Sequence, residues 1–244
     1  MGSFFAGVKA GTLAGVVYVG GLALCNVLLL YALKGDVLEM IRVSFSTVCT
    51  PTAGANATTV AVEDCFSSVV VVYVPLMAFL AFFVSIVYAG LFGWQYEHFP
   101  GSGPGFRGAT IGVVVGLNLV FFNLVGIFFD VFAKVAIVSA FVALTLVYGI
   151  LIGRLYRRYT REVRFASKDS GGIRIMVDNK DCTGRTKTFA AKSTHKVRAE
   201  ADGGASFKEW AASGGVKLED PRSFETVMDV EGDGVLGVKA APQA

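Results

Sequence analysis

The sequence has 244 residues, of which 54% are hydrophobic and only 17% are charged, and its mean hydropathy is +0.60. These values exclude an ordinary soluble protein and predict a membrane protein. Residues 1–153 contain five Lys/Arg and six Asp/Glu, whereas residues 165–244 contain twelve of each sign. The net charge of +3 therefore arises in the short segment between these two parts and does not indicate nucleic-acid binding.

Residues 11–33 form the first apolar run, without a formal charge. As a helix rising 1.5 Å per residue, a run of this length crosses a hydrocarbon core of about 30 Å. We favour a retained helix over a cleaved signal peptide, because the run is long and no clear cleavage site follows it. Gly7, Gly11 and Gly15 line one helix face and predict close helix packing, although glycine is also common in membrane helices.

Residues 34–65 are predicted to form a polar loop with a short interfacial helix near its start. Cys49 and Cys65 lie on either side of Asn56, which begins an Asn-Ala-Thr glycosylation sequence. We therefore expect a Cys49–Cys65 disulfide on an oxidising side of the membrane, with two free thiols as the alternative. No Cys-x-x-Cys occurs, so neither a zinc site nor a thioredoxin-like centre is predicted.

Three further apolar runs follow, at 67–94, 109–129 and 131–153. They complete an all-α membrane domain of four transmembrane helices within residues 1–164. Gly112 and Gly116 form a second motif for close helix packing. Three amides also lie within the spans; they are Asn26, Asn118 and Asn123. The amides are expected to bond between helices, and lining a polar path is the alternative.

A basic collar closes the last span. It consists of Arg154, Arg157, Arg158, Arg161 and Arg164. Positive charge beside a span is retained on the cytoplasmic side, so four spans place both termini in the cytoplasm. We expect the collar to continue the last span as an interfacial helix that contacts anionic head groups, or to be a solvated helix end.

The tail is predicted to be a small all-β domain at residues 173–240, joined by a hinge at 165–172. Its short β-like runs are 173–177, 186–189, 194–199, 207–210, 216–218, 224–230 and 235–238. Turn signals separate them, including Ser213-Gly214-Gly215 and Gly232-Asp233-Gly234. The expected core consists of Val197, Phe207, Trp210 and Met228.

This tail also resembles one unit of the internalin-type B-repeat family. The resemblance is carried by a strand from Thr194, a Phe207-Lys-Glu-Trp210 pair, and a strand from Phe224 that ends at Gly234. It covers about 50 residues of the tail and none of the membrane part. It implies a small β module of a prokaryotic surface protein, used as a spacer or adhesion unit, which would place the tail outside the cell.

The remaining acidic residues and histidines do not indicate a catalytic or metal site. Asp229, Glu231 and Asp233 faintly match a calcium loop but lack the final glutamate, so we interpret them as a β-turn. His98 and His195 are expected to be a loop residue and a packing or surface residue. No catalytic, cofactor or metal site is predicted, and the chain is not expected to be an enzyme.

The sequence therefore favours an integral membrane scaffold or accessory subunit, which packs with partner helices and presents its β domain for protein interaction. The expected partners are the lipid bilayer and other membrane subunits or further copies of the chain, and no nucleic acid. The alternatives are a surface-display or adhesion anchor and a small channel or transporter component.

Overall fold

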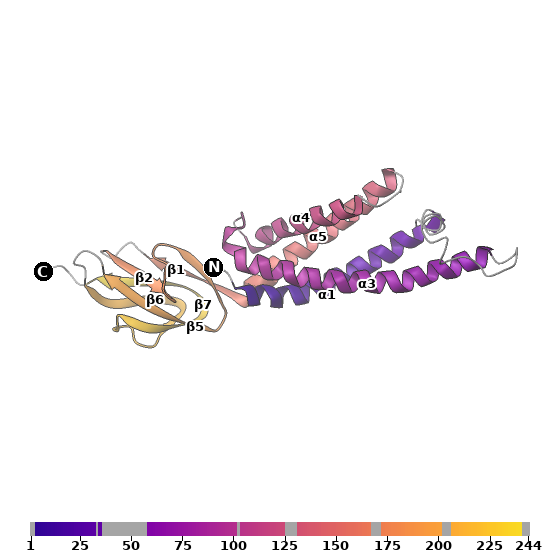
Figure 1. Cartoon of the computed structure of the whole chain (residues 1–244). Helices are drawn as coiled ribbons and strands as arrows, with labels where there is room; N and C mark the ends of the chain where they lie inside the picture. Colours follow the sequence, from indigo (N-terminus) through magenta and orange to yellow (C-terminus); the bar gives the residue numbers. More distant parts are fainter. Residues whose placement is uncertain are drawn as a thin grey trace. The chain divides into compact units, whose positions relative to one another are not determined.

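The computed structural model describes residues 3–32, 34–35, 58–101, 103–124, 131–166, 172–201 and 206–240, with some side chains near the outer helix ends left out. Among the described residues, four α-helices come first, α1 (Phe4–Ala32), α3 (Thr58–Gln95), α4 (Pro104–Leu124) and α5 (Val131–Tyr159), and a β domain follows (Figure 1). The chain forms two compact units; one contains Met1–Ala10, Gly90–Phe99 and Arg154–Ala244, and the other contains Gly11–Ala89 and Pro100–Gly153.

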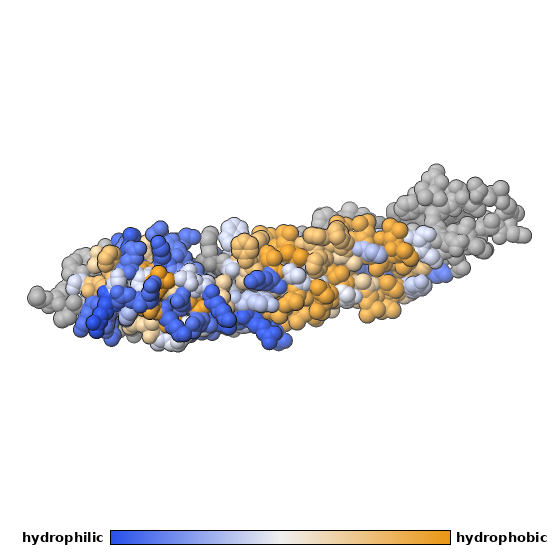
Figure 2. All heavy atoms as spheres, turned by 90° about the horizontal axis from the view of Figure 1, so that it is seen from below, coloured by the Kyte–Doolittle hydropathy of each residue, from blue (hydrophilic) through white to orange (hydrophobic). Residues whose placement is uncertain are grey.

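Three helical segments are long and apolar enough to cross a membrane: Phe4–Ala32, Phe66–His98 and Val138–Tyr159. Within the described part of the chain, the apolar stretch of α4, Pro104–Leu117, is shorter. Hydrophobic residues cover the helices in Figure 2, whereas hydrophilic residues gather over the strands. Large side chains such as Phe79 and Leu117 are more than half exposed, as expected for helices surrounded by lipid.

Small residues let the helices of the second unit pack closely. Gly15 of α1 faces Ser85 of α3, whose Oγ lies 2.6 Å from where a Cβ on Gly15 would be. Gly116 of α4 faces Thr145 of α5 in the same way, again at 2.6 Å. A larger side chain at either glycine would require the facing Ser85 or Thr145 to move. The hydroxyl of Tyr148 donates to the carbonyl of Ser85, so α3 and α5 are also joined by a buried hydrogen bond.

The loop predicted at residues 34–65 is shorter than expected, because α3 already begins at Thr58. The β-branched and acidic residues that precede Cys65 are therefore helical in the backbone. Cys49 and the predicted interfacial helix after Gly35 lie outside the described residues, as does the side chain of Cys65. The disulfide consequently stays a prediction, and of the cysteines whose side chains the structure describes, Cys25 and Cys182 are free thiols.

The β domain is a mixed, curled sheet of seven strands. These are β1 (Thr160–Ala166), β2 (Ile173–Val177), β3 (Lys180–Asp181), β4 (Thr186–Ala190), β5 (Ser193–Ala201), β6 (Phe207–Leu218) and β7 (Glu225–Ala240). Their order is β3-β2-β5-β7-β1-β4, and β6 pairs with β7. Only the β1–β7 pair among the described strands is parallel, in a register that places Val163 beside Gly234. The long β7 thus organises the sheet, because it pairs with three other strands.

Two predicted turns are wrong, because the residues lie inside strands. Ser213-Gly214-Gly215 belongs to β6, and Gly232-Asp233-Gly234 belongs to β7. The two glycine-rich segments meet at a register shift, where Gly214 pairs with Gly234. Gly214 has a φ of +72°, and a Cβ on Gly234 would lie 2.8 Å from Val216. The glycines therefore bend two paired strands where we expected the chain to reverse.

Apolar side chains from nearly every strand form one core in this domain. Of the predicted core residues, Val197, Trp210 and Met228 are buried and Phe207 is partly buried against the same cluster. The indole N–H of Trp210 donates to the carbonyl of Ser223 at 2.9 Å, so its polar atom is satisfied. The core also contains Val163, which lies in the segment that the sequence analysis assigned to the basic collar.

Candidate functional site

The last membrane helix runs directly into the sheet. Tyr159 ends α5 and Thr160 begins β1, and the buried Thr160 hydroxyl donates to the carbonyl of Tyr156 at 2.9 Å. Val163 and Phe165 are almost fully buried in the β-domain core. The prediction that residues 154–164 form an interfacial or solvated helix end is thus wrong beyond Tyr159. The arginines at 161 and 164 belong to a strand because the alternating residues Val163 and Phe165 are apolar and face the core.

The predicted boundary at residue 173 is also too late. Phe165 and Ala166, the first residues of the expected hinge, belong to β1, while residues 167–171 lie outside the described part of the chain. β1 lies between β4 and β7. Because β1 pairs on both of its edges, the sheet of the β domain begins with Thr160.

An aromatic cluster joins the ends of three helices in the same compact unit. The ring of Tyr156 on α5 lies 4.5 Å from the ring of Tyr96 and 5.7 Å from that of Phe92. Its hydroxyl donates to the carbonyl of Gly93 at 3.0 Å and accepts the backbone N–H of Ser3 at 2.9 Å. Gly93 allows this approach, since a Cβ there would lie 2.6 Å from the Ser3 carbonyl oxygen.

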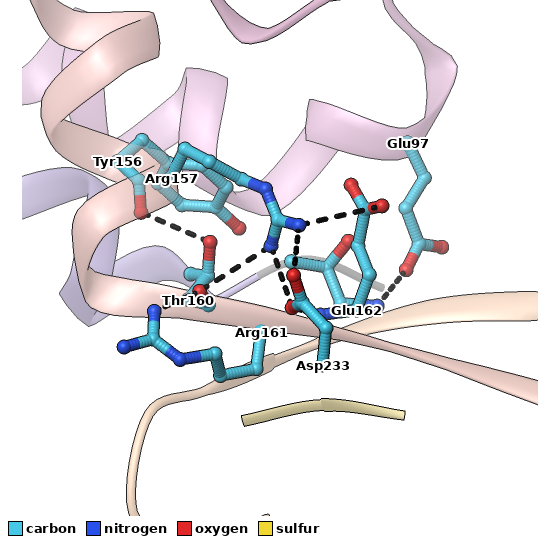
Figure 3. Close-up of polar contacts among 8 residues, drawn as sticks. Glu97, Tyr156, Arg157, Thr160, Arg161, Glu162 and Asp233 are labelled. Atoms are coloured by element: carbon cyan, nitrogen blue, oxygen red, sulfur yellow. Dashed lines mark hydrogen bonds and ion pairs between the residues drawn. The ribbon is translucent and has the colours of Figure 1, made fainter. Parts of the chain in front are cut away.

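A bidentate ion pair connects α5 to β7 (Figure 3). Nη1 of Arg157 donates to Oδ1 of Asp233 at 3.0 Å, and Nη2 donates to Oδ2 at 2.6 Å. Oδ1 also accepts the backbone N–H of Glu162 at 2.8 Å. Although burial alone would raise it, these donors hold the pKa of Asp233 below its usual range. Asp233, predicted as a turn residue, therefore anchors β7 to both α5 and β1.

A second carboxylate, Glu97, binds the edge strand β4. It lies on a short 3-10 helix after α3 (Tyr96–His98), where its Oε2 accepts Nζ of Lys187 at 3.0 Å. Its Oε1 accepts the backbone N–H of Thr188 at 2.9 Å. Burial lowers the pKa of Lys187, but the bond to Glu97 outweighs this and raises it. The carboxylate thus satisfies a backbone donor that an edge strand would otherwise expose.

We call these two carboxylates and their partners the polar junction; it consists of Glu97, Arg157, Glu162, Lys187, Thr188 and Asp233. With the aromatic cluster, it holds the ends of α1, α3 and α5 against the β domain. Arg157 and Asp233 each stand out in the sequence, but their pairing does not, because they are 76 positions apart in the chain.

A cavity of about 570 Å³ lies beside the junction, at the β2–β3 and β4–β5 turns. Its lining includes Asp178, Cys182, Arg185, Lys187, Ser193 and His195. Inside it, Oγ of Ser193 lies 2.8 Å from Nε2 of His195, and Oδ2 of Asp178 lies 2.7 Å from Nδ1 of the same ring. The ring of Phe189 packs on the imidazole at 4.5 Å. His195, expected to be a packing or surface residue, is thus the centre of a hydrogen-bonded chain.

The predicted helix-packing glycines all contact other helices of this chain. Gly7 lies beside Gly93 and Gly11 beside Ala89, so both face α3 as Gly15 does. Gly112 faces the backbone of Thr145 on α5, as Gly116 faces its side chain. The helix faces that these glycines line are therefore already packed against other helices of the same chain.

The remaining predicted site residues do not gather at one place. Asn26 donates to the carbonyl of Leu22 in its own helix at 2.8 Å, so this amide is used locally. The side chains of Asn118 and Asn123 lie outside the described residues. In the part of the chain that the structure describes, no three His, Cys, Asp or Glu side chains are grouped to hold a metal ion.

The fold and the junction define a class: helices apolar enough to cross a membrane, joined without a linker to a curled mixed β domain. No family model, curated protein or solved structure matches the chain. Function must therefore be inferred from the site itself.

Proposed function

We propose that the chain is an integral membrane scaffold or accessory subunit with four membrane spans, which presents its β domain to a protein partner. The observation that most supports this proposal is the polar junction, together with the direct connection of α5 to β1. In its own compact unit the β domain is tied to three helix ends, so it would present a partner with a folded surface instead of a flexible tail. A flexible tether would only raise the local concentration of the partner near the membrane.

The internal use of the glycines supports this proposal over a channel. Gly11, Gly15, Gly112 and Gly116 pack the helices against one another. Asn26, one of the three amides offered for a polar path, bonds within its own helix. The β domain carries an exposed aromatic residue, Phe224, which is 59% accessible and suits a protein contact.

The scaffold role is tested by site-specific photo-crosslinking in native membranes. A photoreactive amino acid at Phe224 should give one discrete protein adduct, whereas the same group at Val71, exposed on the apolar surface of α3, should label lipid. Truncation after Tyr159 should abolish co-purification of the crosslinked partner with the chain, while the helices remain resistant to alkaline extraction. If Phe224 gives no protein adduct and neither do Lys208 and Arg222, which are exposed on the same domain, the scaffold proposal fails.

We further propose that the β domain is cytoplasmic, because the arginines after α5 act on the chain during insertion, before the Arg157–Asp233 pair forms. Cys182 is a poor reporter of sidedness, since it is buried and burial raises the pKa of its thiol. An exposed Lys208→Cys reporter, with the native cysteines replaced by serine, should react with an impermeant maleimide only after permeabilisation. Labelling in intact cells would instead favour the surface-display anchor that the B-repeat resemblance implies.

A further inference from the structure

The face of β5 that carries Ser193 and His195 is the one that faces the core. Side chains two apart in a strand share a face, so these residues continue the row formed by the buried Val197 and Ala199. Opposite them in β7 are Val230 and Met228, both fully buried. Apolar residues are expected at such positions. Two polar side chains there break the local pattern, and such breaks concentrate at functional sites.

Asp178 is held so that one of its oxygens faces the imidazole. It begins the Asp178-Asn179 turn between β2 and β3, where both residues have positive φ, 46° and 64°. Its backbone N–H donates to the carbonyl of Lys196 at 2.9 Å, and its Oδ1 accepts the N–H of Lys196 at 3.1 Å. Oδ2 is then directed to Nδ1 of His195. The carboxylate is thus positioned by the backbone of β5 itself.

These contacts fit one tautomer of the neutral ring, in which Nδ1 carries the proton. When Nδ1 donates to Asp178, Nε2 carries a lone pair toward Oγ of Ser193, at 2.8 Å. The serine hydroxyl has one proton and two acceptors within reach, Nε2 and the carbonyl of Ala190 at 2.7 Å. It can therefore donate to Nε2 while the ring is neutral. It can donate to Ala190 once Nε2 holds a proton.

We propose that Ser193, His195 and Asp178 form a nucleophile–base pair with a positioning carboxylate, which cleaves small esters in the 570 Å³ cavity. The proposal rests on the arrangement that acyl-transfer sites share: a serine hydroxyl on one ring nitrogen, a carboxylate on the other, and space beside them. It is independent of the scaffold function.

The reaction balances without a further reactant. Oγ of Ser193 bonds to the ester carbonyl carbon while its proton passes to Nε2 of His195. The bond to the alcohol oxygen breaks, and the alcohol leaves with that proton. Water then cleaves the acyl-serine, giving one proton back to Oγ through His195, and a carboxylic acid is released. Arg185 lines the same cavity, and a positive charge in the cavity favours a developing oxyanion there.

The test is covalent labelling of the full-length protein in detergent or nanodiscs with a fluorophosphonate probe. We expect one adduct at Ser193 by peptide mapping, and turnover of p-nitrophenyl acetate at a rate above the buffer reaction. Ser193→Ala should abolish both signals, and His195→Ala or Asp178→Asn should slow labelling by at least about 100-fold. The matched control Ser213→Ala removes an exposed serine of β6 and should label like the parent protein.

A second measurement distinguishes a Ser193 activated by His195 from a Ser193 with only a structural role. Ser193→Cys should be alkylated by iodoacetamide faster than Ser213→Cys at neutral pH, and this advantage should disappear when His195→Gln is added. All variants are checked by thermal unfolding. The proposal is overturned if the folded parent protein does not label at Ser193, or if Ser193→Cys reacts no faster than the control cysteine. Either result would mean that the hydrogen bonds among Ser193, His195 and Asp178 only stabilise the two turns.

Discussion

Arg157 and Asp233 are 76 residues apart in the chain and form two parallel hydrogen bonds, with donor–acceptor distances of 3.0 and 2.6 Å. Arg157 lies in the last turn of α5, and Asp233 lies in the strand that organises the sheet. This pair ties the end of α5 to the β domain within one compact unit, and its consequences can be measured.

Asp233→Asn should weaken the junction. The change removes the charge that Arg157 pairs with but keeps the shape of the side chain. Because Asp233 is 54% exposed, we expect a loss of about 1 kcal/mol in the free energy of unfolding. The control is Glu231→Gln, two residues away, whose ion pair with Lys217 is more exposed and should matter less. Equal effects in chemical denaturation would show that the bidentate geometry adds nothing.

Acidification should weaken the same contact. The pKa of Asp233 is lower in the folded protein than in the unfolded chain, so its contribution is fully present above the unfolded pKa of about 4. It is lost as the pH falls through the folded pKa. The urea midpoint of the parent protein should therefore fall more steeply below pH 4 than that of Asp233→Asn. Parallel pH profiles would contradict this assignment.

Tyr156→Phe should destabilise the helix ends. It removes the hydroxyl that donates to Gly93 and accepts from Ser3, in a side chain that is fully buried. Leaving those backbone groups without this partner should cost about 1–3 kcal/mol. Tyr159→Phe, three residues on and only half-buried, is the control and should be close to neutral. Thermal unfolding in the same detergent compares the two directly.

Gly93→Ala should separate α1 from α3. The added Cβ would lie 2.6 Å from the Ser3 carbonyl oxygen and 2.8 Å from Cα of Gly7, both backbone atoms that cannot rotate away. We expect a loss of about 1–3 kcal/mol. Gly20→Ala in α1 meets nothing within 4 Å and should be neutral or stabilising. A Gly93→Ala protein as stable as the parent would rule out the close contact.

The position of β1 predicts where an isolated β domain must begin. A fragment of residues 160–240 contains β1 and the buried Val163 and Phe165, so it should give dispersed amide signals and a cooperative unfolding transition. A fragment of residues 173–240 lacks the strand between β4 and β7 and should not fold. Cooperative folding of the shorter fragment would restore the boundary that the sequence indicated.

Local pattern alone was sufficient for several features. Long apolar runs predict helices because an isolated helix satisfies its own backbone, and three of them are long enough for a membrane. The β-like run at 173–177 coincides with β2, and the glycines every four residues do line packing faces. These features depend on residues within a few positions of one another, which a sequence displays directly.

Tertiary structure decided what depends on distant partners. Residues 160–166 follow a helix and carry three arginine and glutamate charges, so they resemble a helix end, yet pairing with β4 and β7 makes them a strand. Gly214 and Gly234 resemble turns until their pairing shows that they bend two long strands. Asp178 meets His195 only because the β2–β3 turn is tied to β5. Pairing across the sheet determines these contacts, and no local periodicity encodes which strand a segment will meet.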